Sequence, residues 1–89
     1  MSDARTRLEQ GARYPYDATD NWWKDAGSAA PPAADWAHYA ARGIMADLTD
    51  RRGIKYSFDN IDEDVRIEMV ASLAEIIRSA ALESQSARG

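Results

Sequence analysis

The sequence predicts a small, mostly α-helical protein with an antiparallel two-helix core, a short extended connector and an irregular aromatic N-terminal segment. Two stretches, residues 36–52 and 61–82, repeat apolar side chains at helical spacing and have capping residues at their ends. A chain of 89 residues is long enough for one domain, and with no cysteine it contains no disulfide.

The N-terminal third is expected to lack regular structure. Residues 1–13 are polar and include a glycine at position 11, so we expect a flexible tail. Residues 14–34 predict an irregular aromatic segment and a linker. Thr19, Asp20 and Asn21 can each cap a short turn that holds Trp22 and Trp23. Gly27 and Ser28 then break this turn.

Residues 35–82 are the expected helical core. Asp35 is a suitable N-cap for the first helix, and Gly43 predicts a close approach by another backbone or a large side chain. Arg51 and Arg52 suit the negative end of this helix, and Gly53 suits the position after it. The face expected to be buried carries Trp36, Ala40, Gly43, Ile44 and Leu48, together with Asp47, and Tyr39 is also assigned to the core.

The connector alternates apolar and polar residues over 54–58, which favours an extended segment or a very short strand. Whether the N-terminal segment pairs with it stays open. Asn60 and Glu63 have the spacing of a capping box for the second helix. Residues 83–89 are expected to be a flexible tail. The apolar stripe of the second helix is Val65, Met69, Leu73, Ile76, Ile77 and Ala80, widened by Val70, Ala74 and Ala81.

Charge and composition exclude several classes of function. The net charge is −4, and residues 59–89 carry seven acidic but three basic side chains, which makes nucleic-acid binding unfavourable. Because the chain has one histidine and no cysteine, it lacks the usual ligands for zinc, and we expect neither a metal nor a cofactor. His38 lies near Asp47 and Asp50 in sequence, but two helices and a connector offer no pocket in which they converge, so we expect no enzyme.

Two surfaces are candidates for partner binding. Trp22 and Trp23 exceed what a two-helix core needs, and Arg51, Arg52 and Lys55 form a basic corner. The alternative is that both tryptophans pack on the helices and that the arginines only complement the helix dipole. The second candidate is an acidic surface, expected either to cap the helix or to meet a basic groove. Its members are Asp59, Asp62, Glu63 and Asp64.

Residues 35–80 resemble small proteins of bacterial phages and prophages. The resemblance lies in Asp-Trp-Ala at 35–37, Asp-Arg-Arg-Gly-Ile-Lys at 50–55 and Asn-Ile-Asp-Glu-Asp-Val-Arg at 60–66. It implies a mobile-element setting, in which small acidic proteins often inhibit host machinery, anti-CRISPR proteins included. No residue-level function carries over.

The expected function is therefore that of a small, acidic, non-enzymatic protein-binding module, such as a phage-encoded inhibitor of host defence or an accessory factor. The alternative is a small nucleic-acid-binding regulator that uses the basic corner. The sequence has neither a signal-peptide core nor an apolar run long enough to span a bilayer, which predicts a cytoplasmic protein without membrane contact. The partner is expected to be a protein, and a homodimer is a further alternative.

Overall fold

The computed structural model describes residues 3–25 and 29–88, and its elements are helical. They are α1 (Asp3–Arg13), α2 (Asp20–Lys24), α3 (Trp36–Thr49), the 3-10 turn η1 (Lys55–Phe58) and α4 (Glu63–Arg88). None of the described residues lies in a β-strand, so the mostly α-helical class is confirmed. The break predicted at Gly27 and Ser28 lies outside the described residues.

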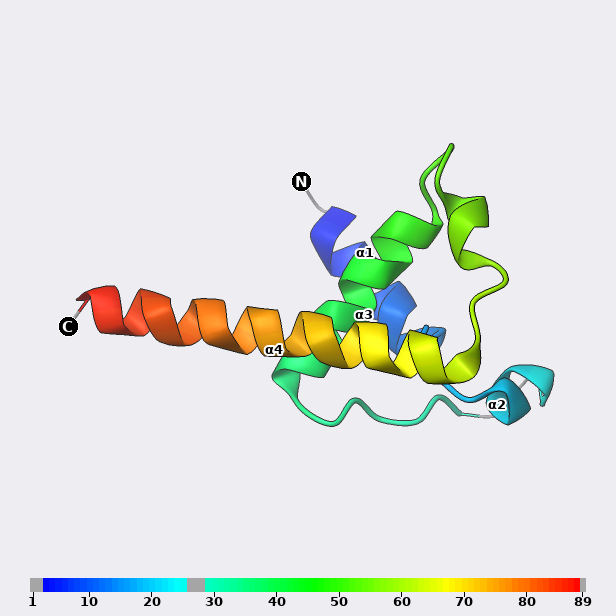
Figure 1. The fold of residues 1–89 in the computed structure, drawn as a ribbon, viewed down its shortest axis with the longest axis horizontal. Helices are drawn as coiled ribbons and strands as arrows, with labels where there is room; N and C mark the ends of the chain where they lie inside the picture. The colour runs from blue at the N-terminus through cyan, green and yellow to red at the C-terminus, as the bar shows by residue number, and fades with distance from the viewer. Residues whose placement is uncertain (1–2, 26–28, 89) are drawn as a thin grey trace.

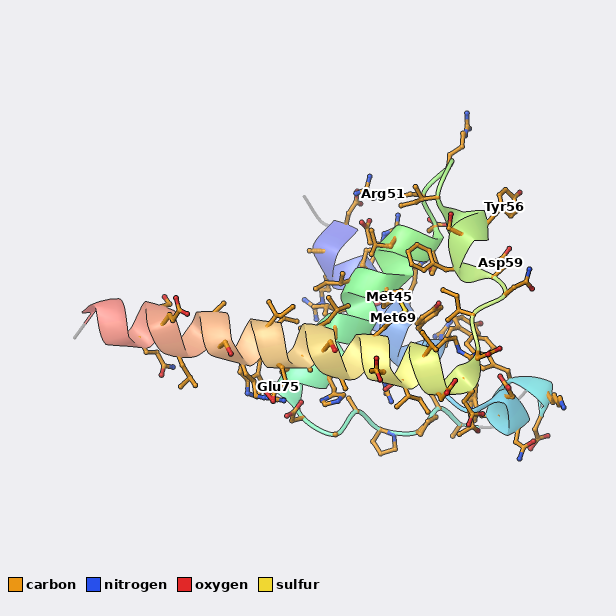
Figure 2. All side chains as sticks on the ribbon, viewed as in Figure 1. Met45, Arg51, Tyr56, Asp59, Met69 and Glu75 are labelled. Atoms are coloured by element: carbon orange, nitrogen blue, oxygen red, sulfur yellow. The ribbon has the colours of Figure 1, made fainter. Side chains whose placement is uncertain are left out.

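The core lies where α4 crosses α3. Figure 1 shows α4 running across α3. From α3, Ala37, Ala41 and Met45 are at most 1% exposed, and Val70 and Ala74 of α4 are fully buried. Because four of these five side chains are alanine or valine, the helices approach closely. Figure 2 shows Met45 and Met69 together at the crossing.

The buried face of α3 differs from the one predicted. Trp36, Tyr39 and Ile44 were expected in the core, but they are 57%, 39% and 40% exposed. The buried core positions are instead spaced four apart, at Ala37, Ala41 and Met45. Two members of the predicted face are confirmed, since Gly43 is buried and Leu48 packs against the core. The prediction gave the large side chains to the core, whereas small residues occupy the helix crossing.

Helix α4 is longer than predicted, and its predicted stripe is confirmed in part: Met69, Leu73 and Ile77 pack against the core. Val70 and Ala74 are buried, whereas Val65 is 44% and Ile76 is 64% exposed. The helix continues to Arg88, so the tail expected at 83–89 is helical over its described part. Figure 1 shows its C-terminal half extending away from the other helices, and the molecule measures 47 × 26 × 22 Å.

The expected N-terminal tail is helix α1, which packs against α3. The prediction was wrong because Gly11 does not interrupt the helix but makes the helix contact possible. A Cβ on Gly11 would lie 2.5 Å from the Arg42 carbonyl carbon. Gly43 was predicted to admit a close neighbour, and Leu8 fills that role: a Cβ on Gly43 would lie 2.8 Å from Leu8 Cδ2.

The connector is a turn and not an extended segment. Helix α3 ends at Thr49, three residues earlier than predicted, and Gly53 has a φ of 95°, which favours glycine. The chain then forms η1, in which the Ser57 N–H donates to the Ile54 carbonyl oxygen at 2.9 Å. The prediction of an extended segment or very short strand at 54–58 is therefore wrong.

Two predicted caps are confirmed and one is not. The Asp35 side chain accepts from the His38 N–H, and the Thr19 hydroxyl accepts from the Trp22 N–H. The capping box of Asn60 does not form, because α4 begins at Glu63. The Glu63 carboxylate instead accepts from the Asp20 N–H at 2.6 Å, across from α4 to the start of α2.

Candidate protein-binding groove

A groove of about 560 Å³ opens between the N-terminal segment, the end of α3 and η1. Its size lies in the range of small-molecule and side-chain binding sites. Four aromatic rings and three carboxylates dominate its walls. The lining residues are Gln10, Tyr14, Tyr16, Asp20, Trp23, Ala46, Thr49, Asp50, Phe58, Asp59 and Arg66.

A buried ion pair fixes the N-terminal segment to α3. Arg42 is 6% exposed, and its Nε donates to Asp17 Oδ1 at 2.7 Å. Its Nη1 also donates to the Pro31 carbonyl oxygen at 2.8 Å, so the guanidinium joins the segment before α2 to the linker after it. Breaking such a pair leaves an uncompensated buried charge, which costs several kcal/mol.

A second arginine, Arg66 of α4, holds the same segment from the other side. Its guanidinium donates to the carbonyl oxygens of Tyr16, Ala18 and Ile61 at 2.8–3.1 Å and to Asp20 Oδ1 at 2.8 Å. Four acceptors for one guanidinium satisfy most of its donors. The backbone that carries the groove's aromatic side chains is therefore anchored at several points.

The aromatic walls come from two ring pairs. Tyr14 and Trp23 stack with centroids 6.5 Å apart and an interplanar angle of 20°. Across the groove, Tyr16 meets Phe58 edge to face, with centroids 6.2 Å apart, and the Tyr16 hydroxyl donates to the Phe58 carbonyl oxygen. The Tyr16 contact joins the N-terminal segment to η1 through side chains and not through a strand ladder.

The aromatic surface of the first pair is exposed. Tyr14 is 58% and Trp23 is 43% exposed, whereas Trp22 is half-buried and meets Trp23 edge to face. Trp22 Nε1 donates to the Ala29 carbonyl oxygen at 3.1 Å, which anchors it. Trp22 therefore holds the segment, whereas Trp23 is exposed.

The basic corner predicted from the sequence lies away from the tryptophans. Figure 2 shows Arg51 at the far end of α3, remote from α2. Arg51 is exposed and pairs with Asp47 at 2.8 Å, and Arg52 is exposed. The Lys55 side chain lies outside what the structure describes. The structure therefore does not bring Arg51 together with Trp22 and Trp23.

The predicted acidic surface divides into separate roles. Asp59 lines the groove, while the Glu63 carboxylate accepts from the Asp20 N–H at the start of α2. Asp62 and Asp64 are exposed at the first turn of α4. The cluster is thus partly structural, and one of its members faces the same groove as Trp23.

The His38 side chain and the Thr49 hydroxyl group of the groove both have hydrogen-bond partners. His38 is not a wall residue of the groove, and its Nδ1 lies 2.9 Å from Asp35 Oδ1. Within the groove, the Thr49 hydroxyl donates to the Met45 carbonyl oxygen. Residues 3–25 and 29–88 contain no group of three or more potential metal ligands, and no helix among them combines the length and hydropathy needed to cross a membrane.

Sequence reasoning missed the residues that build the groove. Arg42 and Arg66 each occupy a helical position outside the expected apolar stripe, and nothing in their spacing identifies their distant acceptors. Tyr14 and Tyr16 gave only a weak sequence signal for the groove, namely two aromatic residues on either side of a proline. The structure shows that this proline, Pro15, is buried. Their arrangement depends on helix α1, which the sequence did not predict.

Comparison with known proteins adds no family to this description. The sequence matches no family model, and no curated protein or solved structure is significantly similar to it.

Proposed function

We propose that this protein is a small, acidic, non-enzymatic protein-binding module whose binding surface is the groove beside Trp23. The observation that carries the proposal is the exposed Tyr14–Trp23 stack at the edge of a groove of about 560 Å³. Exposed tryptophan and tyrosine side chains on an anchored backbone are typical of interface hot spots. Arg42 and Arg66 supply the anchoring.

The rigidity of the segment supports binding. Trp23 lies on a helix whose first turn is capped by Thr19 and also bonded by Glu63. A preorganised aromatic side chain loses little conformational entropy when a partner covers it. The groove therefore favours recognition of a partner without large rearrangement of this chain.

The absence of a catalytic role is part of the proposal. A hydrolytic site needs a nucleophile and a base within hydrogen-bond reach, next to donors for the developing negative charge. In the groove, the one aliphatic hydroxyl, that of Thr49, is bonded to backbone carbonyls, and the carboxylates Asp20 and Asp50 pair with arginines. This arrangement supports binding over chemistry.

The biological setting rests on the resemblance of residues 35–80 to phage and prophage proteins. In that setting the module acts as an inhibitor of a host defence protein or as an accessory factor in the cytoplasm. The net charge of −4 supports a partner with a basic surface, because complementary charge speeds association and selects partners.

The proposed function is tested with two matched tryptophan variants. Trp23→Ala removes a groove wall, whereas Trp36→Ala removes a tryptophan that is 57% exposed on α3 and does not line the groove. Tagged wild-type protein and both variants are used to capture partners from a bacterial lysate. We expect Trp23→Ala, but not Trp36→Ala, to lose the captured protein while keeping the wild-type helical circular dichroism.

Equal capture by all three proteins would contradict the proposed surface. The alternative function, a nucleic-acid-binding regulator, is distinguished by a gel shift at several salt concentrations with Arg51→Glu/Arg52→Glu as the variant. Tight, strongly salt-dependent binding that this variant abolishes would favour the regulator. The ion pair of Arg51 with Asp47 weighs against it, because it partly neutralises the corner.

A further inference from the structure

The charge of the groove is the starting observation. Its walls carry the three carboxylates of Asp20, Asp50 and Asp59 against the one guanidinium of Arg66. Two of these carboxylates already have partners, since Asp20 pairs with Arg66 and Asp50 pairs with Arg7, each at 2.8 Å. The groove is therefore negative even after its internal pairs are counted.

Asp59 differs from the other two carboxylates. It makes no ion pair with any residue in the described part of the chain, and it is exposed. Its charge acts at the inner wall: burial is the main cause that raises the pKa of Tyr16, and the Asp59 carboxylate raises it further while Arg66 lowers it. A carboxylate without an ion-pair partner among the described residues thus lies near Tyr16 in the groove.

The guanidinium of Arg66 does not supply the missing cation. Its Nε, Nη1 and Nη2 are each bonded to the carbonyl oxygens or carboxylate already described, and its side chain is 12% exposed. None of these bonds is to Asp59. The groove thus combines an available carboxylate with the exposed side chains of Tyr14 and Trp23.

These features fit one kind of ligand group. A cation over the face of a tryptophan or tyrosine is attracted by the ring quadrupole, and a nearby carboxylate adds to that attraction. A planar guanidinium satisfies both at once, because it stacks on rings and donates two hydrogen bonds to one carboxylate. An ammonium group lacks the planar shape that favours stacking.

We propose that the groove binds an arginine side chain of a basic segment in the partner protein, with the guanidinium on the Tyr14–Trp23 stack and paired with Asp59. This inference rests on the proposed function, because it names the partner chemistry of the same surface. A volume of about 560 Å³ accommodates a side chain together with adjoining peptide backbone.

The experiment uses the full-length protein labelled with ¹⁵N and three synthetic peptides. Each is a nine-residue Gly-Ser peptide whose central residue is arginine, lysine or citrulline, which keeps the shape of arginine without its charge. Binding is followed by the indole N–H signals of Trp23 and Trp36, which report the groove and a remote exposed site. We expect the arginine peptide to shift the Trp23 signal and to leave the Trp36 signal in place.

The lysine peptide is expected to bind several-fold more weakly than the arginine peptide, and the citrulline peptide is expected to cause no saturable shift. Asp59→Asn should weaken binding of the arginine peptide up to about five-fold, the size expected for an exposed charge pair. Asp62→Asn is the matched control, since it removes the same charge from an exposed position outside the groove. It should bind like the wild type.

Three results would overturn the inference. If Asp59→Asn and Asp62→Asn weakened binding of the arginine peptide equally, the peptide would be attracted by the net charge of the protein alone. Equal binding of the citrulline peptide would show that charge is not recognised, although the groove would still be a peptide site. No shift at Trp23 with any peptide would exclude arginine recognition, whereas the capture experiment with Trp23→Ala decides the proposed function separately.

Discussion

Gly11 and Gly43 are the residues that let helix α1 contact α3. Each lies in a helix, where glycine costs about 1 kcal/mol relative to alanine. At Gly11 the space for a side chain is occupied by the Arg42 backbone, which cannot move aside, whereas at Gly43 the nearest atom is the end of the Leu8 side chain. The two positions should therefore differ in how they tolerate alanine.

We expect Gly11→Ala to destabilise the protein by about 1–3 kcal/mol, although alanine is the better helix former. Gly43→Ala should cost less, because Leu8 can adjust its rotamer. Urea unfolding followed by circular dichroism measures both free energies. A Gly11→Ala variant more stable than the wild type would show that α1 does not pack against Arg42.

Asp35 carries the clearest pH dependence. The backbone N–H of His38 lowers the pKa of Asp35 most, followed by the His38 imidazole, and Arg78 lowers it further. Because the pKa is lower in the folded state than the unfolded value of about 3.9, the ionised carboxylate stabilises the fold above about pH 4. That contribution is lost as the pH falls through the folded pKa.

The expected result is that wild-type protein loses more stability between pH 7 and pH 3 than Asp35→Asn does. Asparagine keeps the capping geometry but has no charge to titrate, so it isolates the ionisation. Thermal unfolding of both proteins at the two pH values makes the comparison. The same loss in both would show that Asp35 does not contribute to acid sensitivity.

At the scale of an element, helix α4 shows how much the burial of branched apolar side chains varies along a single helix. Val70 is fully buried against α3, whereas Ile76 is 64% exposed beyond the crossing. Burial of apolar surface stabilises by an amount that depends on the area removed from water. Equivalent truncations should therefore have unequal effects.

Val70→Ala is expected to cost about 2 kcal/mol, from lost burial and the cavity that remains. Ile76→Ala removes more atoms but should change the free energy of unfolding by no more than about 0.5 kcal/mol. Both are read from urea unfolding curves. A larger loss for Ile76→Ala would mean that its face is covered, for example by a second copy of the chain.

The sequence predicted the elements whose signals are local. Asp35 was identified as a cap and Thr19 was one of three candidates, because capping depends on residues two or three positions away. The two long helices were identified from their periodicity. The phase of α3 was misjudged, because large side chains such as Trp36 outweighed alanine in the expected stripe. On α4 the predicted stripe largely forms the core, and Val65 and Ile76 are the members that are exposed. Small residues identify a crossing only when the partner helix is known.

The groove could not be predicted because its parts are distant in sequence. Trp23 and Asp59 were both singled out, but their common location depends on the bonds of Arg66 to residues 16–20. Those bonds join positions almost 50 residues apart, and no spacing rule specifies them. The sequence analysis placed Trp23 and the basic corner on one binding surface, but the fold separates Trp23 from Arg51.

At the scale of the whole molecule, the N-terminal third decides the architecture. Helix α1 packs on α3, the following segment is held by Arg42 and Arg66, and the groove exists only because both attachments form. The distal half of α4 projects from this body (Figure 1). The central claim is therefore that residues 3–25 are part of the folded unit.

Amide hydrogen exchange over residues 8–12, measured by NMR on the full-length protein, tests this claim most directly. Helix α1 bonds these amides internally and packs them against α3, so we expect exchange at least about 100-fold slower than in an unstructured peptide. Exchange at the unstructured rate, with protection confined to α3 and α4, would contradict the account and leave the groove without one of its walls.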